Sequence, residues 1–208
     1  MFSPETMSTF FVASILLALA PGPDNIFVLT QSALQGTRAG ISVTFGLMTG
    51  LLFHTTTVAL GIAAIVKTSA VAFTALKLFG AAYLIYLAWK AFRTGAHKIS
   101  QDTEGDLRLS KLYTRGVIMN ITNPKVSIFF LAFLPQFTDP TKGAVVLQIM
   151  ALGTLFMAAT LLVFGSIASM SGWLSKWLRS SSQGQIILNR VAGCVFLGLA
   201  IKLATAKQ

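Results

Sequence analysis

Six long apolar stretches restrict what this chain of 208 residues can fold into. They cover residues 8–34, 40–66, 70–92, 116–134, 144–170 and 188–204, and the segments between them are short and polar. About 20 mostly apolar residues are enough for a helix to cross a bilayer. The pattern therefore predicts an all-α integral membrane protein with six transmembrane helices. It leaves no room for a separate soluble domain, so residues 1–208 are expected to form one transmembrane domain.

The content of charged residues agrees with this fold class. Only 11% of the residues are charged and 54% are hydrophobic, whereas a soluble domain usually carries about 25% charged residues. A surface with so few charges cannot face water throughout.

The first apolar stretch is interrupted by the sequence LALAPGPDN at residues 17–25. Its small residues resemble the cleavage site of a secretory signal peptide. However, the residues before Phe10 include Glu5 and no Lys or Arg, and apolar residues resume at 26–29. These features disfavour a cleaved signal and indicate a break inside a membrane helix.

The net charge of +10 is distributed unevenly between the loops. If the N-terminus is outside, the inner segments carry Arg38, Lys90, Arg93, Lys98, Arg108, Lys111, Arg115, Lys176, Arg179 and Arg190. The outer segments carry Lys67, Lys142, Lys202 and Lys207, while Lys77 and Lys125 lie within spans. This bias follows the positive-inside rule and predicts that both termini are extracytoplasmic. The charge is thus explained by topology, and no nucleic-acid partner is expected.

Tryptophans mark the same inner ends of the predicted spans. Trp89, Trp173 and Trp177 are placed there as in an aromatic belt. The segment SGWLSKWLR at 171–179 sets two of them one turn apart beside basic residues. We expect a short interfacial helix here, with a frayed helix end as the alternative.

A weak repeat relates the third and sixth spans. Residues 77–84 read KLFGAAYL and residues 190–197 read RVAGCVFL. Pro-containing breaks also occupy the first span of each half, so the chain is expected to contain two inverted three-helix repeats. Their predicted limits are residues 8–92 and 116–206, joined by a cytoplasmic loop at 93–115. Interrupted helices at matching positions of inverted repeats are typical of secondary transporters, with the site at the breaks; chance similarity between apolar helices is the alternative.

The break in the first span brings a carboxylate into the membrane. Proline lacks an N–H and clashes with the preceding turn, so Pro21, Gly22 and Pro23 should unwind the span and start a new half-helix near Asp24 and Asn25. Asp24 is either a cap for that half-helix or a functional group. A charge at mid-bilayer costs about 3 kcal/mol, and Asn or Ser would cap without that cost. Since Asp24 is the only in-span acid of the six in the chain, a functional role is favoured.

The break in the fourth span brings in a cation. Lys125 follows Asn123 and Pro124, where a positive charge opposes both the bilayer and the helix dipole. A purely structural ion pair with Asp24 is one interpretation. Buried ion pairs are weak evidence for stability, so a pair of site residues is favoured, with Asn120 as a further polar group beside this break.

The second span carries a histidine on a seam of small residues. Gly46, Gly50 and His54 are spaced by four and share one helix face. The glycines permit close helix packing. His54 is either hydrogen-bonded structurally or titrates during transport.

Several motifs resemble one known family. APGPDN at 20–25, NITNPK at 120–125 and GAAYLIYLAWKAFR at 80–93 are similar to those of the LysE (lysine-exporter) family of bacterial amino-acid efflux proteins. GLMTGLLFH at 46–54 and FLPQF at 133–137 look most like the homoserine/threonine exporter branch. The resemblance implies export of a small amino acid across the bacterial inner membrane, with protons as the exchanged partner. Relatives often have Ser where this chain has Ala20.

An intramembrane enzyme, a cation or metal transporter and a passive channel are the alternatives to an exporter. An intramembrane enzyme would need a nucleophile and base, for which only Ser166 and His54 are available. A cation or metal transporter would need more in-span ligands than Asp24 and His54, and a passive channel would leave Asp24 and Lys125 without a coupling role. The lone Cys194 forms no disulfide framework or cysteine metal site. No cofactor is expected, and a homodimer is left open.

A zwitterionic amino acid suggests a division of roles among these residues. The half-helix starts and Lys125 suit the substrate carboxylate. Asp24 and the carbonyls left free before Pro21 suit its ammonium. The second span, including Met48 and His54, would contact the side chain.

Overall fold

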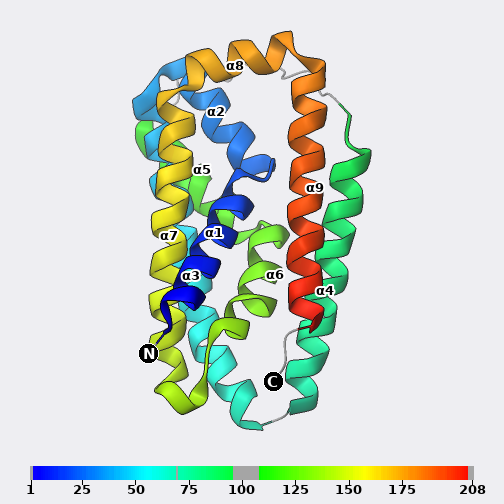
Figure 1. The fold of residues 1–208 in the computed structure, drawn as a ribbon. Helices are drawn as coiled ribbons and strands as arrows, with labels where there is room; N and C mark the ends of the chain where they lie inside the picture. The colour runs from blue at the N-terminus through cyan, green and yellow to red at the C-terminus, as the bar shows by residue number, and fades with distance from the viewer. Residues whose placement is uncertain (1, 69, 96–107, 206–208) are drawn as a thin grey trace.

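The computed structural model describes residues 2–68, 70–95 and 108–205 of the chain. These residues form a bundle of long helices joined by short connections (Figure 1). In chain order the elements are α1 (Pro4–Leu19), α2 (Pro23–Gln35), α3 (Thr37–Thr68), α4 (Ala70–Arg93), α5 (Leu109–Ile121), α6 (Pro124–Ala132), η1 (Leu134–Phe137), η2 (Pro140–Lys142), α7 (Val145–Ser169), α8 (Ser171–Ser180) and α9 (Ser182–Thr205).

The structure contains helices for the six predicted membrane spans, when each bent pair is counted as one span. Four helices contain segments long and apolar enough to cross a membrane: Thr37–Gly61, Thr74–Arg93, Val145–Ser169 and Ser182–Thr205. Two bent pairs supply the other spans, α1 with α2 at 63° and α5 with α6 and η1 at 52°. The all-α membrane fold with broken first and fourth spans is therefore confirmed.

Proline sets the position of both breaks. Pro23 is the first residue of α2, and Pro124 is the first residue of α6. At that position the missing N–H removes no intrahelical bond, and the fixed φ suits the new helix. The preceding residues cannot continue into it, so each span restarts in a new direction.

The two halves of the chain are arranged as inverted repeats. The α1–α2 pair runs toward the end of the bundle where α8 lies, and the α5–α6 pair runs the opposite way (Figure 1). Some of the contacts are paired in the same sense: α1 packs on α7 as α5 packs on α3, and α2 contacts α7 as α6 contacts α3. The α3–α7 and α4–α9 pairs each join equivalent helices.

The bundle has two chemically different ends. α8 lies across the basic end, which also holds the start of α3, the end of α4 and the start of α5 (Figure 1). We call the opposite end, where α1 begins and α9 ends, the terminal end. The predicted short helix is a separate element, α8, rather than a frayed end of α7. Its Trp173 and Trp177 rings stack 6.4 Å apart.

Some helices begin earlier than the hydropathy pattern suggested. α5 begins at Leu109 rather than near residue 116, and α9 begins at Ser182 rather than near residue 188. The predicted loop at 93–115 therefore contributes two turns to α5; residues 96–107 lie outside the described part. Hydropathy marks the lipid-facing length of a helix, whereas backbone hydrogen bonding continues into polar turns beyond it.

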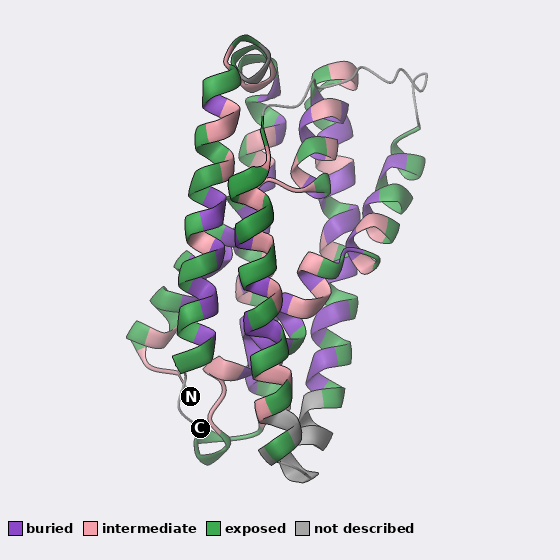
Figure 2. Cartoon of the chain, turned by 90° about the vertical axis from the view of Figure 1, so that its right-hand side faces the viewer, coloured by how far each residue is buried: buried purple, intermediate pink, exposed green. Residues whose placement is uncertain are grey.

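Buried residues line the inside of the helix bundle and exposed residues its outside (Figure 2). Leu60, Phe79 and Leu162 are among the large apolar residues on the outside, each more than half exposed. Such exposure fits a surface that faces lipid rather than water.

Glycine allows α3 and α5 to pack closely. A methyl group added at Gly46 would clash with the Tyr113 carbonyl oxygen and lie 3.0 Å from the Gly116 Cα. At Gly50 it would lie 2.6 Å from the Asn120 side chain. The predicted glycine-containing face of α3 is therefore the surface on which α5, the first helix of the broken fourth span, packs.

We expect Gly46→Ala to lower the free energy of unfolding by about 1–3 kcal/mol, because overpacking forces backbone to move. Gly165→Ala in α7 is the matched control, since nothing lies within 4 Å of the added methyl. That change should be neutral or stabilising by up to about 1 kcal/mol. Denaturation of the purified proteins in detergent measures both, and equal stability of the two variants would contradict the packing argument.

Candidate functional site

The two helix breaks meet inside the bundle through a hydrogen bond between side chains. Asn123 Nδ2, at the start of α6, donates to Asp24 Oδ2 in the first turn of α2 at 3.0 Å. Both residues are buried, each 6% exposed. The structure thus brings together two predicted site residues that are 99 positions apart in sequence.

Asn123 also organises its own helix. Its Oδ1 accepts from the backbone N–H of Lys125 at 3.0 Å, which is a side-chain cap for α6. The equivalent cap position before α2 is held by Gly22, which has no side chain to cap with. Through this one amide, the start of α6 is fixed to the start of α2.

Asp24 and Lys125 occupy equivalent positions in the two halves. Each is the second residue of its half-helix and directly follows the proline that begins it. The inverted repeat therefore sets opposite charges at matching places in one site.

One oxygen of the Asp24 carboxylate is without a partner. Oδ1 is buried and accepts no hydrogen bond from any described residue. The Asn120 Oδ1 is in the same condition, and its side chain lies near the carboxylate. Leaving a buried acceptor unpaired costs about 1–3 kcal/mol, and more for a charge. An unpaired buried carboxylate oxygen indicates a place for a proton or for a donor from a ligand.

Lys125 does not form the direct ion pair that one interpretation of the sequence suggested. Its Nζ donates instead to the Ala20 carbonyl oxygen at 2.8 Å. The ammonium also lies 5.6 Å from the centre of the Phe196 ring and interacts electrostatically with Asp24. The start of α6 faces the end of α1, so the side chain reaches the carbonyl at that end first.

The carbonyls before Pro21 were expected to be free, and for two of them, those of Ala18 and Ala20, this expectation is wrong. Ala18 O accepts from Asn25 Nδ2 at 2.6 Å, and Ala20 O accepts from Lys125. A carbonyl without a partner inside a membrane costs several kcal/mol. The donors of the chain therefore satisfy them, and the ammonium of Lys125 occupies the position assigned to that of a substrate.

His54 supports the second break. Its Nε2 lies 3.1 Å from the Asn120 carbonyl oxygen, which also accepts from the backbone N–H of Asn123. Since a carbonyl can only accept, this ring nitrogen carries the proton. The ring packs against Phe53 and Phe130, both with centroids at 5.9 Å. His54 is therefore hydrogen-bonded in the structure, as one of its two predicted roles requires.

The residues of a serine hydrolase are not assembled. The hydroxyl of Ser166 donates to the Leu162 carbonyl of its own helix at 2.7 Å. His54 is bonded to the Asn120 carbonyl at the break. The only Ser–His pair considered from the sequence is therefore not formed.

One member of the site was not among the predicted residues. The Ala20 carbonyl was covered by the expectation for the carbonyls before Pro21, although its partner is Lys125 rather than a substrate ammonium. Phe196 was not predicted, although it holds the aromatic position of the repeat motif that Tyr83 holds in the first half. That equivalence was a usable signal for a residue packed on the site.

Comparisons with known proteins find relatives along nearly the whole chain. The family model described as LysE type translocator matches residues 15–207. A homoserine/homoserine lactone efflux protein of Salmonella typhimurium is 31% identical over 205 residues, covering 98% of each chain. A leucine efflux protein of Salmonella choleraesuis is 27% identical over 201 residues, covering 96% of this chain and 95% of its own. An uncharacterized membrane protein of Vibrio cholerae serotype O1 is 32% identical over 198 residues, covering 95% and 96%. No solved structure matches.

Proposed function

The chain belongs to the LysE type translocator family of amino-acid efflux transporters, which are not enzymes, and from that premise we propose its substrate and coupling. The substrate is a small neutral amino acid, homoserine- or threonine-like, exported from the cytoplasm in exchange for protons. The proposed location is the bacterial inner membrane, with the terminal end outside.

The observation that carries this proposal is the Lys125 ammonium bonded to the carbonyl at the end of α1. An α-amino acid carries a carboxylate and an ammonium on neighbouring atoms. Its carboxylate would draw Lys125 away from Ala20, because a charge-assisted bond to an anion is stronger than one to a neutral carbonyl. The substrate ammonium then takes the vacated carbonyl and the unpaired Oδ1 of Asp24.

This exchange keeps the number of paired groups nearly constant. With substrate absent, Lys125 satisfies the carbonyl; with substrate bound, each cation has an anionic or carbonyl partner. The amino acid therefore binds without leaving a polar group unpaired in the membrane. The substrate side chain would contact the other walls of the site, and α3 contributes Met48 and His54 to these walls.

Asp24 is the group we assign to proton coupling. As a carboxylate it binds the substrate ammonium, and in the empty site a proton on Oδ1 removes the unpaired charge. Binding of substrate and binding of a proton are thus mutually exclusive, which is the condition for antiport.

Competing transport classes fit the geometry less well. A divalent-cation site would need its ligands to converge, but Asp24 is bonded to Asn123 and His54 to the Asn120 carbonyl. A passive channel needs an open polar path, whereas Asp24, Asn120 and Asn123 are buried.

Fusion reporters test the proposed orientation. A reporter attached after Gln208 should behave as extracytoplasmic, because the basic residues gather at the opposite end. A fusion after Gly95, which follows the basic end of α4, is the matched control and should behave as cytoplasmic. Cytoplasmic activity of the fusion after Gln208 would contradict the orientation.

Asp24→Asn should abolish uphill export while permitting slow exchange of substrate across the membrane. The amide still offers a carbonyl to the ammonium but cannot gain and lose a proton. Accumulation against a gradient and exchange at equal concentrations are measured in the same reconstituted vesicles. If the variant still pumps uphill, the proton is carried elsewhere.

Lys125→Gln should weaken binding of every amino-acid substrate by about 10–100-fold, the equivalent of one charge-assisted hydrogen bond. Changes at Met48 or His54 should instead alter which amino acid is preferred. Lys90→Gln, an exposed lysine near the basic end of α4, is the matched control for loss of charge.

A decarboxylated analogue sharpens the test of Lys125. Without a carboxylate it should be a poor substrate of the unmodified protein, and Lys125→Gln should affect it less than the parent amino acid. Export of the analogue at the rate of its parent would show that Lys125 is not the carboxylate ligand.

A further inference from the structure

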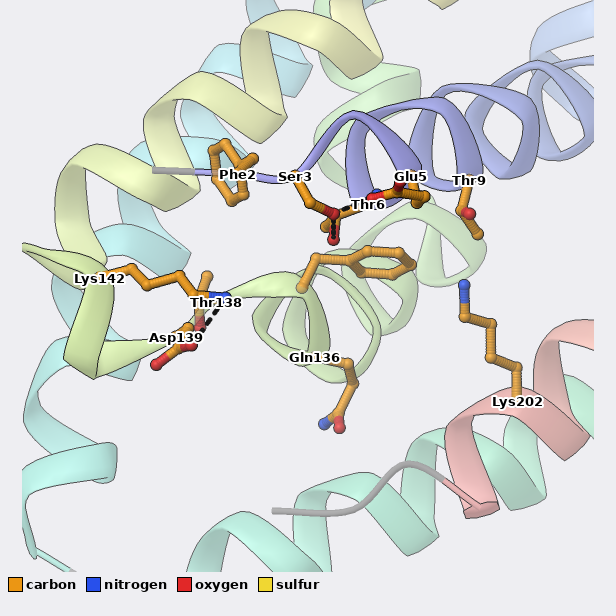
Figure 3. Close-up of a pocket in the computed structure, with 11 residues that line it drawn as sticks. Phe2, Ser3, Glu5, Thr6, Thr9, Gln136, Thr138, Asp139, Lys142 and Lys202 are labelled. Atoms are coloured by element: carbon orange, nitrogen blue, oxygen red, sulfur yellow. Dashed lines mark hydrogen bonds and ion pairs between the residues drawn. The ribbon is translucent and has the colours of Figure 1, made fainter.

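A polar cavity lies at the terminal end of the bundle, away from the helix breaks (Figure 3). It has a volume of about 390 Å³ and lies between the start of α1, the η1–η2 segment and the last turns of α9. Small-molecule sites usually have about 300–1,000 Å³, so one amino acid fits. Side chains of both charges line it.

Two of the charged residues in this cavity already neutralise each other. Lys142 Nζ lies 3.3 Å from Asp139 Oδ2, and Asp139 Oδ1 accepts from the hydroxyl and backbone N–H of Thr141. These hydrogen bonds hold the pKa of Asp139 below its ordinary value. This pair is therefore part of the wall.

The other two charged residues have no charged partner. Within the described part of the chain, neither Glu5 nor Lys202 forms an ion pair. Lys202 extends from α9 toward Thr9 on α1 (Figure 3), and its ammonium lies 4.4 Å from the centre of the Phe137 ring. Glu5 lies in the first turn of α1 on the same cavity, with its carboxylate beside the Ser3 hydroxyl. An ammonium and a carboxylate without ion-pair partners are what a zwitterion requires.

A row of aromatic rings joins this cavity to the central site. Lys125 and Phe129 are spaced by four and share one face of α6, and Phe133, directly after the end of α6, continues the same spacing. Phe129 and Phe133 stack at 4.6 Å, and Phe133 packs on Phe137 at 5.0 Å. Phe129 and Phe133 are each only 1% exposed. The row of residues that begins at Lys125 thus ends at Phe137, the ring under the Lys202 ammonium. The buried rings of Phe129 and Phe133 lie between these two ends and close the path.

We propose that this cavity is an exit site that binds the exported α-amino acid as a zwitterion after it leaves the helix breaks. Lys202 binds the carboxylate and Glu5 binds the ammonium. When Lys202 turns to the carboxylate, it leaves the Phe137 ring, which frees the outermost member of the aromatic row. The inference rests on the proposed export function and on the terminal end facing out.

Site-directed labelling from outside the cell tests the exit site. The chain has one cysteine, so Cys194→Ser provides a background for a single reporter, Thr9→Cys, on the cavity wall. A membrane-impermeant maleimide should label it from outside. External homoserine, threonine or leucine, whichever the flux assay shows to be exported, should slow the labelling, and its decarboxylated analogue should not.

Charge variants in the same background decide which groups bind. Lys202→Gln and Glu5→Gln should each raise the amino-acid concentration that gives half protection at least about tenfold, because each removes one charge-assisted contact. Lys202→Arg retains the charge and should retain protection. Lys90→Gln is the matched control and should leave protection unchanged.

The outcomes separate this inference from the proposed function. If the unmodified cavity is not protected, or is labelled only from the cytoplasmic side, the exit site is overturned. Flux measured on vesicles prepared from the same cells shows independently whether the chain exports the amino acid. Export without protection would therefore reject the exit site and leave the proposed function standing. Protection that persists in both Lys202→Gln and Glu5→Gln would also overturn the assignment.

Discussion

The structure depends on the need to pair backbone groups that two broken helices leave free inside a membrane. Each break removes several intrahelical hydrogen bonds, and lipid offers no donor or acceptor in their place. The chain supplies its own: Asn25 and Lys125 donate to the carbonyls at the end of α1, and Asn123 accepts at the start of α6. His54 donates to the carbonyl of Asn120. The polar residues of the site are thus the residues that make the breaks tolerable.

A site built this way is prepared for exchange of partners. Lys125 carries a primary ammonium, the same chemical group that an amino acid carries, and it binds the carbonyl that we propose for the substrate ammonium. In the proposed exchange, replacing one ammonium by the other changes little in the pairing of polar groups, so neither state would be strongly favoured by the protein. A transporter needs this near balance, because tight binding of one state would stop the cycle.

The inverted repeat brings equivalent positions of the two halves together, and different residues at those positions give the site its opposite charges. Asp24 and Lys125 follow equivalent prolines, and Gly22 and Asn123 occupy the equivalent cap positions. Identical halves would set like charges against each other. Opposite charges instead match a zwitterion, and the amide of Asn123 links the two half-helices.

Local patterns in the sequence determined the number of spans, the two proline breaks, the separate helix α8 and the membership of Asp24, Asn123 and Lys125 in one region. Hydropathy, proline geometry and the rule for basic loops each act over a few residues, so they can be read along the chain. The tertiary structure alone decided which donor reaches which acceptor. It gave Lys125 to the carbonyl of Ala20, 105 residues away, rather than to Asp24, because that choice depends on where the end of α1 lies relative to the start of α6. The cavity lined by Glu5 and Lys202 likewise required the structure, since opposite ends of the chain form it and no motif in either end records the other.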